Sequence, residues 1–177
     1  MTRLFVALRP PLAMRERLRA TMHGLPGARW QSDEQLHLTL RFIGDVDRHR
    51  CDDIVAALGR VRGPKPSLGI DGVGTFTSKG RPNSIWAAVP LTAELARIAK
   101  SVDRALVGVD LAPEARAFRP HITLARLGRS AMPVDEWIAN NAALRVDVAP
   151  FEHLFLYESV LGQDGSTYIV AERYPLG

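Results

Sequence analysis

Two short segments of the chain place a histidine and a threonine two residues apart within apolar surroundings. In LHLTLRFIGD these residues are His37 and Thr39, and in FRPHITLARL they are His121 and Thr123. Because side chains alternate across a β-strand, each histidine shares one face with its threonine, and the intervening apolar residues occupy the other face. The apolar face suits a protein core, so the His/Thr face is expected to line a polar site.

Two imidazoles and two hydroxyls around one small volume are typical of phosphodiester cleavage without a metal ion. One neutral histidine removes a proton from the attacking water, and one protonated histidine supplies a proton to the departing oxygen. The threonine hydroxyls would donate hydrogen bonds to the non-bridging oxygens, where negative charge develops. A single His-x-Thr is weak evidence, because buried His and Thr are often satisfied by local hydrogen bonds. Two copies at equivalent places favour a catalytic role.

The two halves of the chain repeat each other. FTSKGRPNSIWAAV resembles YESVLGQDGSTYIVAE, and the offset from His37 to His121 is 84 residues. The repeat predicts one bilobal α+β domain over residues 1–177, with copies at approximately 1–89 and 90–177. Two copies are too few for a solenoid. We expect two lobes related by a pseudo-twofold axis, each a mostly antiparallel sheet with outer helices, and an active-site groove between them.

Hydrophobic periodicity and turn residues predict the elements that carry these motifs. The chain is expected to close with a hairpin at LGQDG. Strands are predicted over 3–9, 36–43, 67–76, 84–90 and 118–127, and helices over 10–23, 47–62, 92–107 and 133–144.

Composition indicates a globular protein with an anionic partner. The chain has 177 residues, is 46% hydrophobic and carries a formal net charge of +4, which favours an anionic ligand without identifying it. No run of about 18 apolar residues exists to span a bilayer, and arginines and prolines interrupt the opening segment, so we expect a cytoplasmic protein. The single cysteine, Cys51, cannot form an internal disulfide, and no cluster has the spacing of a zinc site.

The segments LHLTLRFIGDV and FRPHITLARL, together with the opening RLFVAL, resemble the two-histidine (2H) phosphoesterase superfamily, specifically the RNA 2′,3′-cyclic phosphodiesterases historically called 2′-5′ RNA ligases. The resemblance implies a central basic groove and hydrolysis of a 2′,3′-cyclic phosphate to a 2′-phosphate, with no cofactor and no metal. It also implies that His37 gives a proton to the leaving 3′ oxygen and that His121 takes one from water. Thr39 and Thr123 would hold the phosphate.

Three further residues are candidates for substrate binding. Arg126 matches a phosphate-binding arginine of the family, but it lies five residues after His121 and would point to the opposite face unless a bulge near Ala125 redirects it. Arg41 has the parity of the first motif and is expected as a charge at the rim of the groove, whereas Phe42 is expected on the apolar face. Phe5 is expected either to stack on a base or to lie in the core.

Three functions remain open at this stage. The first is the cyclic phosphodiesterase, acting as a monomer on RNA or an oligonucleotide with a 2′,3′-cyclic phosphate end. The second is an RNA 2′-5′ ligase, which runs the same chemistry backward on a 5′-hydroxyl. The third is an RNA or nucleotide binding module without catalysis, whose binding would be sensitive to salt.

Overall fold

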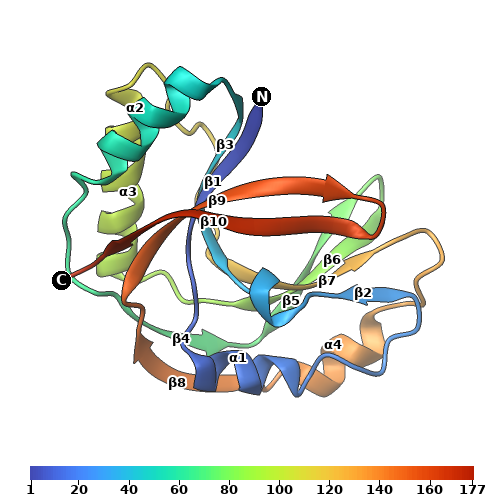
Figure 1. Cartoon of the computed structure of the whole chain (residues 1–177). Helices are drawn as coiled ribbons and strands as arrows, with labels where there is room; N and C mark the ends of the chain where they lie inside the picture. Colours follow the sequence, from blue (N-terminus) through green and yellow to red (C-terminus); the bar gives the residue numbers. More distant parts are fainter.

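The computed structural model describes all residues from Met1 to Gly177. It is an α+β fold, as the sequence predicts, with one large antiparallel sheet, a small two-stranded sheet and four helices (Figure 1). The elements are β1 (Thr2–Leu8), α1 (Leu12–Arg19), β2 (Ala28–Trp30), the 3-10 helix η1 (Asp33–Gln35), β3 (Leu38–Val46), α2 (Arg48–Leu58), β4 (Ser67–Asp71), β5 (Val73–Ser78), β6 (Arg81–Ala88), α3 (Ala93–Val107), β7 (His121–Leu127), α4 (Asp135–Asn141), β8 (Arg145–Pro150), β9 (His153–Gly162) and β10 (Gly165–Pro175).

The large sheet has the strand order β10-β9-β1-β3-β7-β6-β5, and β2 pairs with β7 beside this path. The two strands that carry the His-x-Thr motifs, β3 and β7, are therefore neighbours at its centre. They share a single residue pair, Leu38 with Ile122. The two sheets expected from the repeat are thus two halves of one sheet, joined at its middle by this pair.

The two copies of the repeat exchange their hairpins. The β5-β6 hairpin belongs to the first half of the chain but pairs with β7 of the second half. The β9-β10 hairpin belongs to the second half but pairs with β1 of the first. Strands β4 and β8, one from each half, form the small sheet. Each strand that carries a His-x-Thr motif is therefore embedded in a half-sheet built from both halves of the sequence.

All four helices contribute to one hydrophobic core on one face of the large sheet. The core cluster contains Met14 from α1, Ile54 from α2, Val102 from α3 and Trp137 from α4, together with the apolar face of the central strands. A second, smaller cluster is formed by strand residues alone, centred on Phe5. This helix-free face carries both His-x-Thr motifs, and we call it the catalytic face. In Figure 1, α2 and α3 lie side by side, and α1 and α4 lie near the small sheet.

Local signals account for several helix and strand boundaries, but α2 ends at Leu58 and not at 62, and the short strand β2 is not predicted from the sequence. The Thr92 side chain caps α3 by accepting a hydrogen bond from the backbone N–H of Leu95 at 3.1 Å. The strand predicted over 67–76 is instead two strands, because Gly72 has a φ of +85° and turns the chain from the small sheet into the large one. No helix is long and apolar enough to cross a membrane.

Candidate active site

The four side chains of the two motifs lie on the same face of neighbouring strands. Since β3 and β7 are antiparallel and Leu38 pairs with Ile122, the adjoining residues place His37 opposite Thr123 and Thr39 opposite His121. Leu38 and Ile122 themselves are fully buried on the core side. The alternation inferred from the sequence therefore brings two imidazoles and two hydroxyls together, at the point where the two half-sheets meet.

Hydrogen bonds orient the His37 ring. Its Nδ1 lies 2.7 Å from the backbone oxygen of Gln35, and its Nε2 lies 3.0 Å from the Thr39 hydroxyl oxygen. Because a carbonyl can only accept, Nδ1 carries a hydrogen, and the lone pair of the neutral ring is on Nε2. The nitrogen that faces Thr39 is thus the one that can exchange a proton with a substrate.

His121 is held in the same way. Its Nδ1 lies 2.6 Å from the backbone oxygen of Arg119, again two residues before the histidine. The Nε2 of its neutral ring is therefore also the nitrogen with a free lone pair. The equivalence of the two arrangements means that each copy of the motif fixes its own tautomer through its own backbone.

The pKa values of both imidazoles are lowered, which favours their neutral forms in the free protein. The pKa of His37 is lowered from 6.5 to about 4, chiefly by burial, with contributions from the positive charges of Arg126 and His121 and against the raising effect of the Gln35 hydrogen bond. Burial also lowers the pKa of His121, again with a contribution from Arg126. A phosphate anion bound between the rings would act in the opposite direction, because a negative charge stabilises the imidazolium form.

An aromatic cluster surrounds His37. Its ring centroid lies 4.9 Å from that of Phe5 and 5.1 Å from that of Tyr168, the latter at an interplanar angle of 89°. Phe5 stacks on Tyr157 at 5.1 Å and is only 2% exposed. Phe5 is therefore not available to a substrate base. It packs against the His37 imidazole, so of its two expected roles the structure gives it the core role.

A corresponding pair of aromatic rings surrounds His121. Phe76 lies 4.8 Å from the imidazole at 88°, and Trp86 lies 6.0 Å away. The indole crosses the backbone of Gly74 on the neighbouring strand, where a Cβ would lie 2.2 Å from the ring. Glycine is therefore required at position 74 for the indole to lie in this place.

A β-bulge turns Arg126 to the catalytic face. Thr123 pairs with Trp86 and Ala125 with Ile85, so Leu124 is an extra residue without a partner on β6. Leu124 and Ala125 are both fully buried, and the alternation resumes with Arg126 on the side of His121. After burial, the positive charge of Arg126 is one of the contributions that lower the pKa of both histidines. The bulge on which the role of Arg126 depends is therefore present.

An equivalent bulge in β3 changes the roles expected of two residues. Thr39 pairs with Ala7 and Arg41 with Val6, which leaves Leu40 without a partner on β1. Arg41 consequently points into the helical side and is 9% exposed, so it is not a charge at the rim of a groove. Phe42 takes the catalytic face instead and is 56% exposed, with its ring 6.0 Å from that of Phe5.

Arg41 joins the first motif strand to the segment that precedes the second motif. Its guanidinium lies 2.9 Å from the Asp103 carboxylate on α3 and 3.6 Å from that of Glu114, and it donates a hydrogen bond to the Ala112 backbone oxygen. The segment between α3 and β7 has little regular structure. Arg41 therefore helps to hold the chain that leads to His121.

Two cavities lie outside the four motif side chains. One cavity has a volume of about 490 Å³ and lies between η1 and the β9-β10 turn, where Gln35 and Tyr168 are among the residues that line it. The Gln35 side chain donates a 2.6 Å hydrogen bond to the Ser166 backbone oxygen across this cavity. This cavity adjoins His37 in the chain and extends the candidate site.

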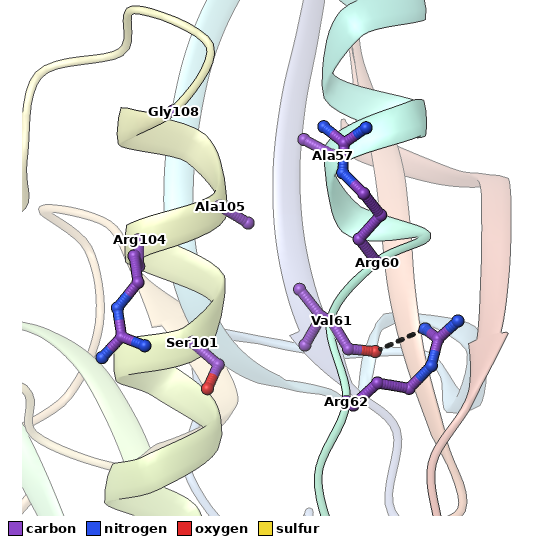
Figure 2. Close-up of a pocket in the computed structure, with 8 residues that line it drawn as sticks. All are labelled: Ala57, Arg60, Val61, Arg62, Ser101, Arg104, Ala105 and Gly108. Atoms are coloured by element: carbon purple, nitrogen blue, oxygen red, sulfur yellow. Dashed lines mark hydrogen bonds between the residues drawn. The ribbon is translucent and has the colours of Figure 1, made fainter.

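The other cavity, of about 330 Å³, lies between α2 and α3 on the helical side. It is lined by three arginines, Arg60, Arg62 and Arg104, and by no carboxylate. Figure 2 shows the guanidinium groups of Arg62 and Arg104 pointing away from each other, so the arginines do not converge on one point. No group of three or more His, Cys, Asp or Glu side chains is arranged to hold a metal ion.

Comparison with known proteins places this geometry in a family. The model of the family described as LigT like Phosphoesterase matches residues 8–86 and 88–162. The chain is 32% identical over 139 residues to an RNA 2′,3′-cyclic phosphodiesterase of Aeropyrum pernix, covering 77% of this chain and 79% of that protein. It is 33% identical over 150 residues to a protein of the same name from Thermotoga maritima, covering 81% and 77%.

A solved structure supports the same conclusion. The crystal structure of TT0787 of Thermus thermophilus has a TM-score of 0.80 to this chain at 25% identity, covering 98% of this chain and 97% of that one. The matched family segments include both His-x-Thr motifs, one in each segment. The chain thus belongs to the LigT-like phosphoesterase family.

Proposed function

We propose that the protein hydrolyses the 2′,3′-cyclic phosphate at the end of an RNA to a 2′-phosphate, using its two His-x-Thr motifs as acid and base. The observation that carries the proposal is the placement of two imidazoles on one face of adjoining strands beside Arg126, each with its Nδ1 hydrogen bonded to a backbone oxygen and its lone pair on Nε2. The relatives named RNA 2′,3′-cyclic phosphodiesterase support the same substrate class. All of these side chains come from one chain, which supports activity as a monomer.

In the proposed reaction, water attacks the phosphorus of the cyclic diester. His121 Nε2 accepts a proton from the water as the new P–O bond forms, and His37 Nε2 donates a proton to the 3′ oxygen as its bond to phosphorus breaks. One water is consumed, and the products are a 2′-phosphate and a free 3′-hydroxyl. The assignment of acid and base follows the family resemblance, because the pseudo-symmetry of the two motifs gives neither histidine a unique geometry.

The remaining groups bind the phosphate oxygens. Thr39 and Thr123 each have a hydroxyl that can donate to a non-bridging oxygen, and Arg126 can make charge-assisted hydrogen bonds to the same group. Bound substrate also supplies the negative charge that raises the low pKa of His37, which makes protonation of this imidazole favourable only when it is needed. The site thereby couples substrate binding to formation of its general acid.

A product analysis tests the proposal. Purified protein is incubated in EDTA with an oligonucleotide that ends in a 2′,3′-cyclic phosphate, and the position of the product phosphate is determined. We expect a 2′-phosphate, and a rate loss of about 10²- to 10⁴-fold in His37→Ala and in His121→Ala. His49→Ala, on the exposed side of α2, is the matched control. A 3′-phosphate product would reverse the roles of the two histidines, and undiminished activity in both alanine variants would exclude the mechanism.

A further inference from the structure

We propose that Gln35 is a positioning residue for His37, because its side chain anchors to the β9-β10 hairpin the same residue whose backbone oxygen holds the imidazole. This inference rests on the proposed function, since it concerns how His37 is prepared for proton transfer. Gln35 would act through the imidazole and would not touch the substrate.

Three hydrogen bonds meet at Gln35. Its backbone oxygen lies 2.7 Å from His37 Nδ1. Its side-chain Oε1 accepts a hydrogen bond from the backbone N–H of Ser32 at 2.8 Å, and its Nε2 donates one to the backbone oxygen of Ser166 at 2.6 Å. A carboxamide has both a donor and an acceptor, so a glutamine can make both side-chain bonds at once. One residue thus connects the imidazole, the start of η1 and the start of β10.

The short helix η1 depends on such contacts at both of its ends. It has three residues, and the hydrogen bonds of a 3-10 helix have poorer geometry than those of an α-helix. Its first residue, Asp33, forms ion pairs with Arg9 and Arg15, each at 3.0 Å. Its last residue is Gln35, which is held by the hairpin. The carbonyl that orients His37 is therefore fixed by tertiary contacts and not by the helix alone.

The β9-β10 hairpin also contacts the imidazole directly. Tyr168 follows Ser166 by two residues on β10, and its ring centroid lies 5.1 Å from that of His37 at an interplanar angle of 89°. The hairpin thus holds both the ring and, through Gln35, the residue that orients the ring. Gln35 and Ser166 are 131 residues apart in the chain, so the second half of the sequence fixes a histidine of the first half.

The second copy of the motif holds its histidine without a side-chain anchor. Arg119 lies 84 residues after Gln35, and its backbone oxygen lies 2.6 Å from His121 Nδ1, but its side chain is exposed. Pro120 follows Arg119 and restricts its backbone to extended conformations, which steadies the carbonyl. The first copy has Leu36 in place of this proline, and leucine imposes no such restriction. The first copy is therefore the one that needs a side-chain anchor.

Loss of the anchor has a specific consequence for His37. The tautomer of a neutral imidazole is set by the hydrogen bond that one of its two nitrogens makes. Without the bond to Ser166, the Gln35 carbonyl is free to move away from Nδ1, and the ring can then carry its hydrogen on either nitrogen. The ring also loses the bond that keeps Nε2 directed toward Thr39 and the phosphate site.

Nuclear magnetic resonance of the ¹⁵N-labelled protein at pH 7.5 tests this directly, because long-range ¹H–¹⁵N correlations show which nitrogen of each ring carries the hydrogen. Gln35→Met keeps the length of the side chain without its hydrogen bonds. Gln35→Glu keeps the acceptor for Ser32 but lacks the donor for Ser166. In both variants we expect His37 to change from the Nδ1–H form to a mixture of tautomers, while His121 keeps the Nδ1–H form.

The same variants are compared in hydrolysis of adenosine 2′,3′-cyclic phosphate. Gln35→Met is expected to lower kcat about 2- to 12-fold, the factor that corresponds to one ordinary hydrogen bond. KM is expected to stay near the wild-type value, because the side chain makes no contact with the substrate. Gln163→Met is the matched control for the tautomer, since Gln163 is an exposed glutamine of the hairpin turn that lines the same cavity.

A single Nδ1–H tautomer of His37 in both Gln35 variants would overturn the inference. So would loss of this tautomer in His121 as well, or in Gln163→Met, because either result would show general loosening of the site. Thermal unfolding identifies any variant that is not folded, and either Gln35 variant alone is sufficient for the test. A wild-type protein that did not hydrolyse the substrate would instead contradict the proposed function, and the tautomer of His37 would still decide whether Gln35 positions it.

Discussion

Burial of His37 makes the free energy of unfolding depend on pH between about 6.5 and about 4. The pKa of its imidazole falls from 6.5 to about 4 on folding, chiefly through loss of hydration. At 1.36 kcal/mol per pKa unit, a shift of this size corresponds to about 3 kcal/mol. Because the unfolded chain binds the proton at a pH where the folded protein does not, the His37 contribution makes the protein less stable as the pH falls through this window, and this contribution changes no further below it.

The change that tests this is His37→Gln, which removes the titrating ring and keeps a polar side chain of similar reach. Urea unfolding of the wild type and the variant is measured from pH 7.5 to pH 3.5. The difference between their free energies of unfolding isolates His37, because all other titrating groups are common to both proteins. We expect this difference to change by about 3 kcal/mol across the window, to the disadvantage of the wild type at low pH.

A nuclear magnetic resonance titration of the imidazole rings gives an independent value for the same pKa. His49→Gln, on the exposed side of α2, is the control for the loss of a histidine elsewhere in the chain. A His37 ring that titrates near 6.5, together with a difference that is flat with pH, would refute the desolvation argument. It would also remove the reason for expecting that the general acid forms only with substrate bound.

Three further outcomes follow from the site and its support. Because His37 and His121 both have lowered pKa values in the free protein, the proposed mechanism places the pH optimum of kcat/KM below 6.5. The optimum of kcat is expected at higher pH, because bound phosphate favours the imidazolium form; coincident profiles would contradict this. Arg126→Gln is expected to lower kcat/KM about 10- to 100-fold, because a charge-assisted hydrogen bond to the phosphate is lost, and to raise the pKa of both imidazoles, because a positive charge is lost. Arg126→Lys is expected to return the pKa of both imidazoles to the lower wild-type values without restoring kcat/KM. Asp103→Asn is expected to destabilise the protein by about 3 kcal/mol in urea unfolding, because the buried Arg41 guanidinium is left with the more distant Glu114 as its only carboxylate partner. A change below about 0.5 kcal/mol would show that the pair of Arg41 and Asp103 contributes little.

Local periodicity was sufficient to predict which side chains of the two motifs share a face. Alternation is a property of the strand itself, so His37 and Thr39 could be placed on one side without knowledge of the neighbouring strands. Strand alternation alone would place Arg126 on the face opposite to His121. A role for Arg126 at the site therefore required a bulge, and the structure contains one at Leu124. The repeat then supplied the expectation that both pairs belong to one site.

The same reasoning misplaced Arg41 and Phe42, because a bulge depends on pairing with another strand and leaves no mark in local alternation. One signal was nevertheless available in the sequence. When the two motifs are aligned, the position equivalent to Arg126 is Phe42 and not Arg41. A bulge that one copy of the repeat requires was therefore to be expected in the other copy. The exchange of hairpins between the halves could not be predicted in this way, because strand order is set by contacts between distant segments.

The equivalence of Phe42 and Arg126 bears on how such a fold can arise from one copy of its repeat. Two identical chains around a twofold axis must carry the same residue at both positions, and their shared site would be unable to tell one end of a ligand from the other. Once the copies are joined in a single chain, each position can diverge alone. Duplication and fusion thereby allow a directional site, in which the two ends of a ligand meet different side chains.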